Sequence, residues 1–483
     1  MTLSWLDFSI VIAYLVAVTL LGARFGKKQR TLQDYFLGGN RLPWWAIALS
    51  VVSAETSILT IISTPGIAYA TNLEFLQLIF GYLVARVVVA FVLLPKYFTG
   101  ELFTAYQFIE RRFGRGLKVF TAGLFLGSRA LAEGVRVFAI SIVIEVIFKT
   151  GVLTAVLIIT ALTLFYTFEG GLTAVIWTDV IQLSIYLAGT AAALAWAVHA
   201  IPGGWAQVVH LANTSGGKFS VFNFHFNWHQ PYLFWSGLIG GLFLTSASHG
   251  TDQLIVQRLL AARNKRQSQA ALLASGLVIL FQFALFLVAG VVLFTFYHFF
   301  PPAHPFARPD KIYPTFVVTE LPHGLAGLLI AAIIAAAMAN LSAAFNSLAS
   351  SSVVDFYRPF VRPDADERHY LRVSRGLTLF WGAVLIAIAL LVQHLHESVL
   401  ELALTIASVP YGAMLGIFML GALTRRTTAR GALIGAALGL LTLLLILTGN
   451  ALQIINIAWT WYVVIGALVT FSAGWALSRK NSN

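Results

Sequence analysis

The feature that most constrains this chain is a series of thirteen apolar segments, many of them close to twenty residues long. An α-helix needs about 20 apolar residues to cross the ~30 Å hydrocarbon core of a bilayer. Only 10% of the 483 residues are charged, so a water-soluble domain could not cover its surface with polar groups. The sequence therefore predicts an all-α polytopic membrane protein, with one transmembrane domain filling residues 1–483.

The predicted spans are residues 4–23, 44–71, 75–97, 117–147, 151–168, 173–198, 230–257, 270–299, 323–357, 372–393, 398–423, 430–448 and 457–478. Thirteen crossings put the termini on opposite sides, which the basic residues can test. With the N-terminus outside, twenty-four of the 31 lysines and arginines fall in cytoplasmic loops and their flanks, against four outside. This split predicts a protein of the cell inner membrane with an external N-terminus and a cytoplasmic C-terminus.

The net charge of +12 then forms a cytoplasmic rim that faces anionic membrane lipid, and no nucleic-acid partner is expected. The chain has no cysteine, which excludes disulfides, thiolate metal sites and cysteine nucleophiles. A cleaved signal peptide is not expected. The first apolar run has no basic leader before it and carries the acidic residue Asp7. The external connection 199–229 is the longest, and its composition fits either a lid or a simple connector.

Charged residues inside the predicted spans are costly, and such residues usually face the interior of a helix bundle. They are Glu55, Arg86, Arg129, Glu133, Arg136, Glu145, Asp179 and Asp252. Arg86 and Glu145 lie near span ends, where they could extend toward the interface, so no role is assigned to them.

Arg129, Glu133 and Arg136 stand at i, i+4 and i+7, on one face of a helix. Two interpretations stay open. The three side chains form a ladder that neutralises itself, or one guanidinium remains available to grip a substrate carboxylate with two hydrogen bonds.

Two of the spans are poorly suited to continuous helices. Hydroxyls and a carboxylate interrupt the second span at Ser53–Ser57, and Pro65-Gly66 follows; the seventh span has a similar interruption at Thr245–Asp252. Broken helices of this kind supply carbonyls to cations in secondary transporters. Because the two broken spans are five apart, they predict two inverted five-helix repeats, at about 44–198 and 230–423.

Four stretches of the chain resemble the sodium:solute symporter family, which includes sodium–proline, sodium–glucose, sodium–iodide, sodium–sialic acid and sodium–pantothenate carriers. They are YFLGGNRLPWW from Tyr35, GGLTAVIWTDVIQ from Gly170, GTDQLIVQR from Gly250 and NSLASSSVVDFY from Asn346. Each pattern is weak alone, but their order and spacing are specific, and the resemblance covers roughly residues 5 to 475. It implies a LeuT-type core and sodium-coupled uptake of a small polar organic solute such as a sugar, amino acid or carboxylate.

The resemblance also implies a sodium site between the first and eighth core helices. Its ligands would be the backbone carbonyls of Ser53, Thr56 and Ala336 and the side chains at positions 339 and 340. Many family members have two hydroxyl residues at that pair, whereas this chain has Ala339 and Asn340. One hydroxyl ligand is therefore lost, and the Asn340 amide oxygen has a different reach.

A second sodium site found in some relatives implies Asp179 and Ser342 as ligands, with Ala343 replacing a further hydroxyl. From the residues alone, Asp179 could instead cap or pair at the cytoplasmic end of its helix. Proton coupling through Asp179 or Glu55 is the alternative to sodium coupling. A transporter-like membrane sensor is a further alternative, although no cytoplasmic signalling domain follows the last predicted span.

The family's substrate pockets imply a set of solute ligands on the first, third and sixth core helices. They are Glu55, Ser57, Thr60, Arg129, Arg136 and Ser248. A relative that binds a carboxylated sugar uses an arginine on the third core helix, and the sequence prefers neither Arg129 nor Arg136. No enzymatic centre and no cofactor are expected beyond sodium as the coupling ion, since only His249 and Asp252 lie together. The sequence carries no signal for an oligomeric state.

Overall fold

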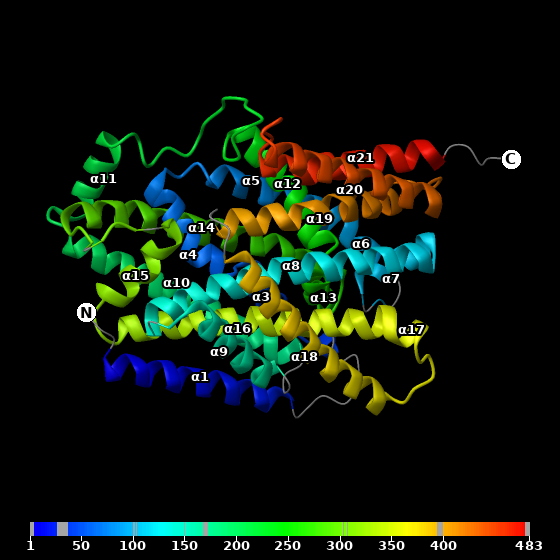
Figure 1. The fold of residues 1–483 in the computed structure, drawn as a ribbon, viewed down its shortest axis with the longest axis horizontal. Helices are drawn as coiled ribbons and strands as arrows, with labels where there is room; N and C mark the ends of the chain where they lie inside the picture. Colours follow the sequence, from blue (N-terminus) through cyan, green and yellow to red (C-terminus); the bar gives the residue numbers. More distant parts are fainter. Residues whose placement is uncertain are drawn as a thin grey trace.

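The computed structural model describes residues 4–26, 37–99, 102, 104–148, 150–167, 172–302, 304–306, 308–393 and 399–478. Within these ranges every regular element is a helix, and an isolated β-bridge pairs Leu42 with Ala262. The long helices run side by side along the longest axis of the molecule (Figure 1). The all-helical class predicted from the sequence is confirmed for the described residues.

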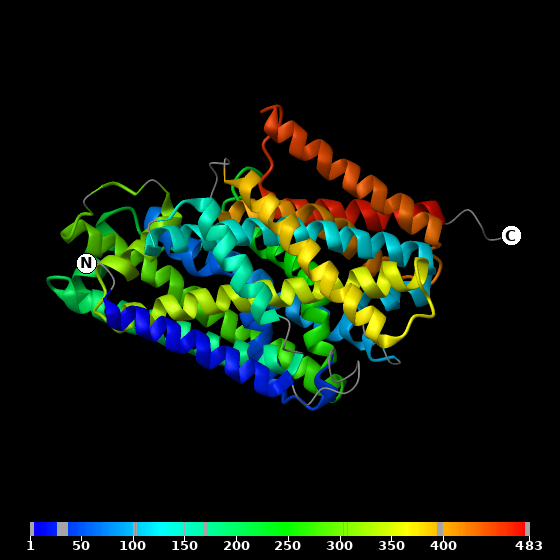
Figure 2. The same cartoon turned by 60° about the horizontal axis from the view of Figure 1, so that its bottom comes forward.

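The helices in chain order are α1 (Trp5–Gly26), η1 (Gly38–Asn40), α3 (Trp44–Glu55), α4 (Ile58–Ala70), α5 (Leu76–Val88), η2 (Val89–Leu93), α6 (Leu94–Tyr97), α7 (Ala105–Phe113), α8 (Arg115–Phe148), α9 (Val152–Thr167), α10 (Leu172–Ala200), α11 (Gly204–Thr214), α12 (Phe234–Gly250), α13 (Gln253–Leu260), α14 (Lys265–Phe299), η3 (Pro309–Lys311), α15 (Ile312–Thr319), α16 (Leu325–Ser351), η4 (Ser352–Tyr357), α17 (Arg358–Phe360), α18 (Glu367–Val392), α19 (Val399–Leu423), α20 (Ala429–Ala451), η5 (Trp459–Trp461) and α21 (Tyr462–Leu477). Figure 2 shows α1 alongside α16, and α20 at the periphery against α21.

Helices occupy each of the thirteen predicted ranges, but they do not all have the length and composition of a membrane span. Among the described residues, 8 helices are long and apolar enough to cross, or 9 when the bent pair α3–α4 is one span. Helix α12 is only 17 residues long, and α8 carries the charged residues Arg129, Glu133 and Arg136. The number thirteen therefore stays a prediction.

The first predicted interruption lies at Thr56 and Ser57, whose extended backbone separates α3 from α4 and bends the pair by 65°. Pro65-Gly66, which follows this interruption in the sequence, does not break the helix, and α4 continues through both residues to Ala70. These two residues serve packing instead. The backbone of Pro309 approaches where a side chain of Gly66 would stand, and the carbonyl of Pro65 lies against Gly290 of α14.

The second interruption is shorter than the sequence predicts. Helix α12 stays helical through Thr245 to Gly250, and the chain leaves the helix only at Thr251 and Asp252. Asp252 caps α13, since its side chain accepts a hydrogen bond from the backbone N–H of Leu254 at 2.9 Å.

Helices α5 and α12 pack closely because glycines replace side chains where they meet. Gly81 of α5 lies against the backbone of Leu238 and Gly241, and Gly237 lies against the backbone of Gln77. The four-residue spacing of Gly237 and Gly241 puts both on one face of α12, as in other closely packed membrane helices. A Cβ atom at any of these glycines would collide with backbone atoms of the neighbouring helix.

Replacing Gly241 with leucine is therefore expected to destabilise the bundle, by the ~1–3 kcal/mol typical of overpacking. The midpoint of thermal unfolding of the detergent-purified protein, followed by loss of the monodisperse chromatographic peak, should fall by several degrees. Gly127→Leu is the matched control, because Gly127 is exposed on α8 and a Cβ there meets nothing within 4 Å. Equal unfolding midpoints for the two variants would contradict the packing argument.

The connection between α10 and α12 is attached to the bundle along much of its length. It contains α11, and the ammonium of Lys218 donates to the backbone carbonyls of Tyr69 at 2.7 Å and Thr71 at 3.0 Å. Burial disfavours the charged form and lowers the pKa of Lys218. Further along, the carbonyl of Trp228 accepts a hydrogen bond from Ala458 N at 2.8 Å. These contacts favour the interpretation of residues 199–229 as a simple connector over their interpretation as a lid.

Candidate functional site

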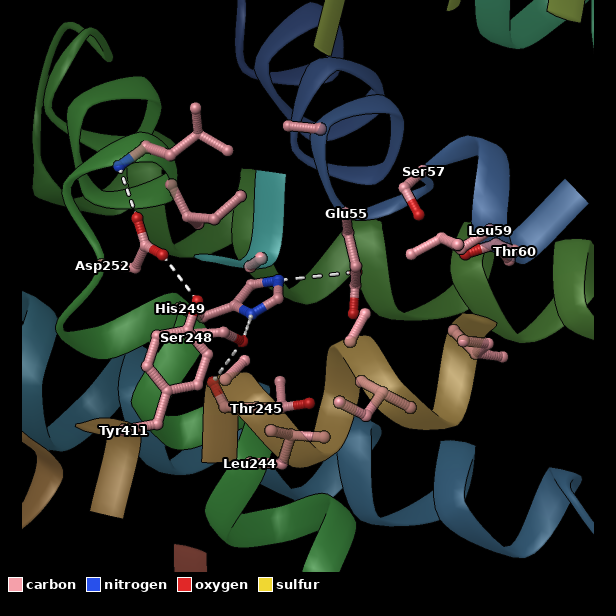
Figure 3. Close-up of a pocket in the computed structure, with 18 of the residues that line it drawn as sticks. Glu55, Ser57, Leu59, Thr60, Leu244, Thr245, Ser248, His249, Asp252 and Tyr411 are labelled. Atoms are coloured by element: carbon pink, nitrogen blue, oxygen red, sulfur yellow. Dashed lines mark hydrogen bonds and ion pairs between the residues drawn. The ribbon is translucent and has the colours of Figure 1, made fainter. Parts of the chain in front are cut away.

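A cavity lies beside both helix breaks, between α3–α4, α5, α8, α12–α13 and α19 (Figure 3). It holds about 900 Å³ of empty space, including the part that is open to solvent. Its wall combines apolar side chains such as Phe75 and Phe283 with charged groups, so it can both enclose a solute and orient it.

All the side chains that the sequence predicts as solute ligands line this one cavity. They are Glu55, Ser57, Thr60, Arg129, Arg136 and Ser248. In Figure 3, Glu55, Ser57 and Thr60 lie along the α3–α4 ribbon, while Ser248 lies on α12. The structure therefore brings the predicted set together, and their role as substrate ligands stays a prediction.

The Arg–Glu–Arg ladder of α8 is present in the structure. The buried carboxylate of Glu133 lies 2.7 Å from Nη2 of Arg129, and Nη1 of Arg136 donates to the same oxygen. Arg129 has a second carboxylate partner, because its Nη1 lies 3.5 Å from Oδ2 of Asp252. That Asp252 oxygen also accepts a hydrogen bond from the hydroxyl of Tyr411 at 2.6 Å. Arg129 is thus held by two carboxylates and Arg136 by one.

A second charged cluster joins three helices on the other side of the cavity. Arg86 of α5 is buried and donates to Glu55 at the end of α3, so its interpretation as a residue that extends to the interface is wrong. Nε of Arg86 also donates to Ser275 at 3.0 Å. Nε2 of His249 lies 3.3 Å from Arg86 and 3.5 Å from Oε2 of Glu55, and Nδ1 of His249 lies 2.9 Å from the Ser248 hydroxyl.

Sequence reasoning missed Arg86, His249 and Tyr411 as residues of this site. For Arg86 a signal existed, since a carboxylate and a guanidinium buried in neighbouring apolar spans need partners. For Tyr411 no such signal existed, because an aromatic residue in an apolar helix is ordinary core composition.

The predicted sodium ligands lie where α16 meets the break between α3 and α4. Nδ2 of Asn340 donates to the backbone carbonyl of Thr56 at 2.9 Å. The hydroxyl of Thr56 exchanges hydrogen bonds with the Gln282 amide at 2.7 and 3.0 Å, which fixes the break against α14. Ser53 and Ala336 are buried on the two helices, and the side chain of Ala339 lies outside the described part of the structure.

Asp179, predicted for a second sodium site, is buried on α10 and paired. Its Oδ2 lies 3.1 Å from Nη2 of Arg258 and accepts the Ser50 hydroxyl at 2.5 Å. Nε of Arg258 also donates to Ser50 at 2.9 Å. Ser342 is buried on α16, which packs against α10. This geometry matches the pairing interpretation of Asp179, and the second sodium site stays a prediction.

Comparison with known proteins finds relatives that match nearly the whole chain and that are named as sodium-coupled carriers. The chain is 29% identical over 442 residues to sodium-coupled monocarboxylate transporter 1 of Homo sapiens, covering 90% of this chain and 72% of that protein. It is 29% identical over 496 residues to the sodium/sialic acid symporter NanT of Aliivibrio fischeri, covering 99% and 94%.

Among solved structures, the substrate-bound outward-open state of a Na⁺-coupled sialic acid symporter has a TM-score of 0.86 to this chain. The two are 26% identical, and the match covers 98% of both. Residues 35–439 match the family model described as "Sodium:solute symporter family", which confirms the resemblance noted from the four stretches. The chain therefore belongs to the sodium:solute symporter family.

Proposed function

We propose that this protein is a sodium-coupled symporter that takes up a small polar organic solute. The observation that carries the proposal is the relation between two cavities. A smaller one, with about 200 Å³ of empty space, is lined by Asn340 of the predicted sodium site and by Ser57 and Arg136, which also line the larger cavity. Bound cation and bound solute would therefore be neighbours, so that the binding of one can favour the binding of the other. The relatives named above are sodium-coupled carriers and not enzymes.

The proposal includes a LeuT-type core of two inverted five-helix repeats, in a chain that crosses the inner membrane thirteen times. Two observations support it. Each repeat begins with a broken helix, α3–α4 or α12–α13, and both breaks border the cavity. The start of α1 and the end of α21 lie at opposite ends of the long axis (Figure 1), as an odd number of crossings requires.

One sodium ion supplies enough free energy for this function. An ion that moves down a tenfold gradient releases ~1.4 kcal/mol, and a membrane potential of about 100 mV adds ~2.3 kcal/mol. The total of ~3.7 kcal/mol could concentrate a neutral solute roughly 500-fold, at ~1.4 kcal/mol per tenfold. A single site at Thr56 and Asn340 would therefore suffice.

The test is uptake of labelled solutes into proteoliposomes that contain the purified protein. Sialic acid, glucose, lactate and a mixture of amino acids should be compared under an inward sodium gradient and under a matched potassium gradient. We expect at least one solute to accumulate only with sodium. Accumulation that follows a proton gradient and ignores sodium would identify the proton-coupled alternative, and binding without uptake would identify the sensor.

The topology has its own test. Reporter fusions after residues 30, 115, 265 and 365 should all read cytoplasmic, because the basic residues cluster in these connections. A fusion after residue 215, in the connection between α11 and α12, is the control and should read periplasmic. Periplasmic signals from two of the four positions would contradict the count of thirteen spans.

A further inference from the structure

Two charged groups of opposite sign are more exposed than the other charged residues that line the large cavity. The side chains of Arg136 and Glu55 are 18% and 14% exposed, whereas the other charged residues that line the cavity, Arg129 and Asp252, are at most 5% exposed. Arg136 belongs to α8 and Glu55 to the end of α3, so a solute between these helices would meet a positive and a negative side chain together.

Glu55 uses only one of its carboxylate oxygens inside the protein. Arg86 and His249 both approach Oε2, and no described residue donates a hydrogen bond to Oε1. An ionised carboxylate can accept about four hydrogen bonds through its two oxygens. The vacant oxygen therefore offers an acceptor with negative charge to a donor that enters the cavity. An ammonium is the donor that matches it in charge.

Only one nitrogen of the Arg136 guanidinium donates a hydrogen bond to a described residue of the protein. Nη1 donates to Glu133, while Nε is buried without a partner among the described residues, and none of them accepts from Nη2. Nε–H and Nη2–H point from the same edge of the planar group and form the fork that pairs with both oxygens of a carboxylate. A buried N–H without a partner is costly, so a ligand at this edge would relieve a cost already present.

The charges of the wall sum to zero before any solute enters. The charged side chains that line the cavity are the guanidinium ions of Arg129 and Arg136 and the carboxylates of Glu55 and Asp252. A monocarboxylate would satisfy Arg136 but would bring a second carboxylate to the cavity of Glu55 and no donor for the vacant oxygen of Glu55. A neutral sugar would leave the Arg136 edge with hydroxyl acceptors in place of an anion. A zwitterion adds no net charge and matches both groups.

We infer that the solute is a zwitterion of the amino-acid type. Its carboxylate binds the Nε–Nη2 edge of Arg136, and its ammonium donates to Oε1 of Glu55. The inference rests on the proposed function and names the class of solute for the same cavity. It also makes Glu55 the specificity-determining residue, since only a solute with a cationic donor gains from it.

The experiment measures binding to the full-length protein in detergent, by thermal shift and calorimetry, with the twenty proteinogenic amino acids, glucose, sialic acid and lactate. For each amino acid that binds, its N-acetyl derivative and its amide are the matched anion and cation. We expect the zwitterion to bind at least tenfold more tightly than either derivative. Glu55→Gln should reduce its preference over the N-acetyl anion to about twofold or less. Glu145→Gln, outside the cavity near Lys311, should leave the preference unchanged.

The outcomes separate this inference from the proposed function. If glucose, sialic acid or lactate binds with sodium dependence and no amino acid does, the inference is wrong and sodium symport stands. If an amino acid binds with the expected preference but neither binding nor uptake responds to sodium, the inference stands and the proposed coupling is wrong. Equal affinity for an amino acid and its N-acetyl derivative in the unaltered protein would also overturn the inference, whether or not the Glu55 variant folds.

Discussion

Replacing Arg136 with glutamine is expected to reduce solute uptake about a hundredfold while the protein stays folded. Hydrogen bonds to charged groups contribute ~1.5–3 kcal/mol, and each ~1.4 kcal/mol changes binding tenfold. Arg136 has one carboxylate partner in the protein, and its side chain is 18% exposed. Its replacement should therefore weaken solute binding more than it destabilises the fold. The measurement is the initial uptake rate in proteoliposomes, normalised to folded protein.

Arg129 provides the comparison, because it occupies the same helix face with different surroundings. It is buried between Glu133 and Asp252, so Arg129→Gln removes the partner of buried carboxylates. We expect this variant, like Glu133→Ala, to lose ~3–5 kcal/mol of stability. Normal transport by both arginine variants would mean that the ladder is purely structural and that the solute need not carry a carboxylate.

Replacing Asn340 with alanine is expected to raise the sodium concentration for half-maximal uptake roughly tenfold. This change corresponds to a loss of ~1.4 kcal/mol in the free energy of sodium binding. The Asn340 amide lies 2.9 Å from the carbonyl of Thr56, which is itself a predicted sodium ligand. A half-turn of the amide would bring its oxygen to the place that the nitrogen now holds, next to the ion. Asn340 also offers the only side-chain oxygen at the altered pair, since position 339 is alanine.

Two further variants test this assignment of the sodium site. Ala339→Ser restores the hydroxyl common in the family and should lower the sodium requirement. Asp179→Asn should affect it less, because Asp179 is paired with Arg258 and Ser50. The initial rate should be recorded against sodium concentration at fixed pH and membrane potential. A rate that follows protons instead, and loses this response in Asp179→Asn or Glu55→Gln, would show that the coupling ion has changed.

Local sequence predicted one helix break correctly, but it does not determine whether the residues that follow continue the helix. At Thr56 and Ser57 the hydroxyls and the adjacent Glu55 interrupt an apolar run, and the backbone leaves the helix there. Pro65 has the same local signature of a breaker, yet α4 continues through it. Local sequence also does not show the tertiary contacts of this turn, where the backbone of Pro309 lies against Gly66 and the Pro65 carbonyl lies against Gly290.

The sequence identified several of the charges that lie in the bundle but not Arg258, Asp310 or Asp355, and it could not identify most of their partners. Periodicity gives partners on the same helix face, such as Glu133 for Arg129. It gives none between helices, so the pairs Arg86–Glu55 and Arg258–Asp179 were found only in the structure. The six predicted solute ligands gather in one cavity because the family resemblance carried information about which helices face each other.

The glycine contacts described above limit which parts of the molecule can move. Where the backbones of α5 and α12 touch at Gly81 and Gly241, and those of α4 and α14 at Gly290, no layer of side chains exists that could slide. Both broken helices therefore belong to a rigid body. Any swing of α8 and α19 against this body must stretch the links from Arg129 and Tyr411 to Asp252. These two links would have to open in such a motion and form again after it.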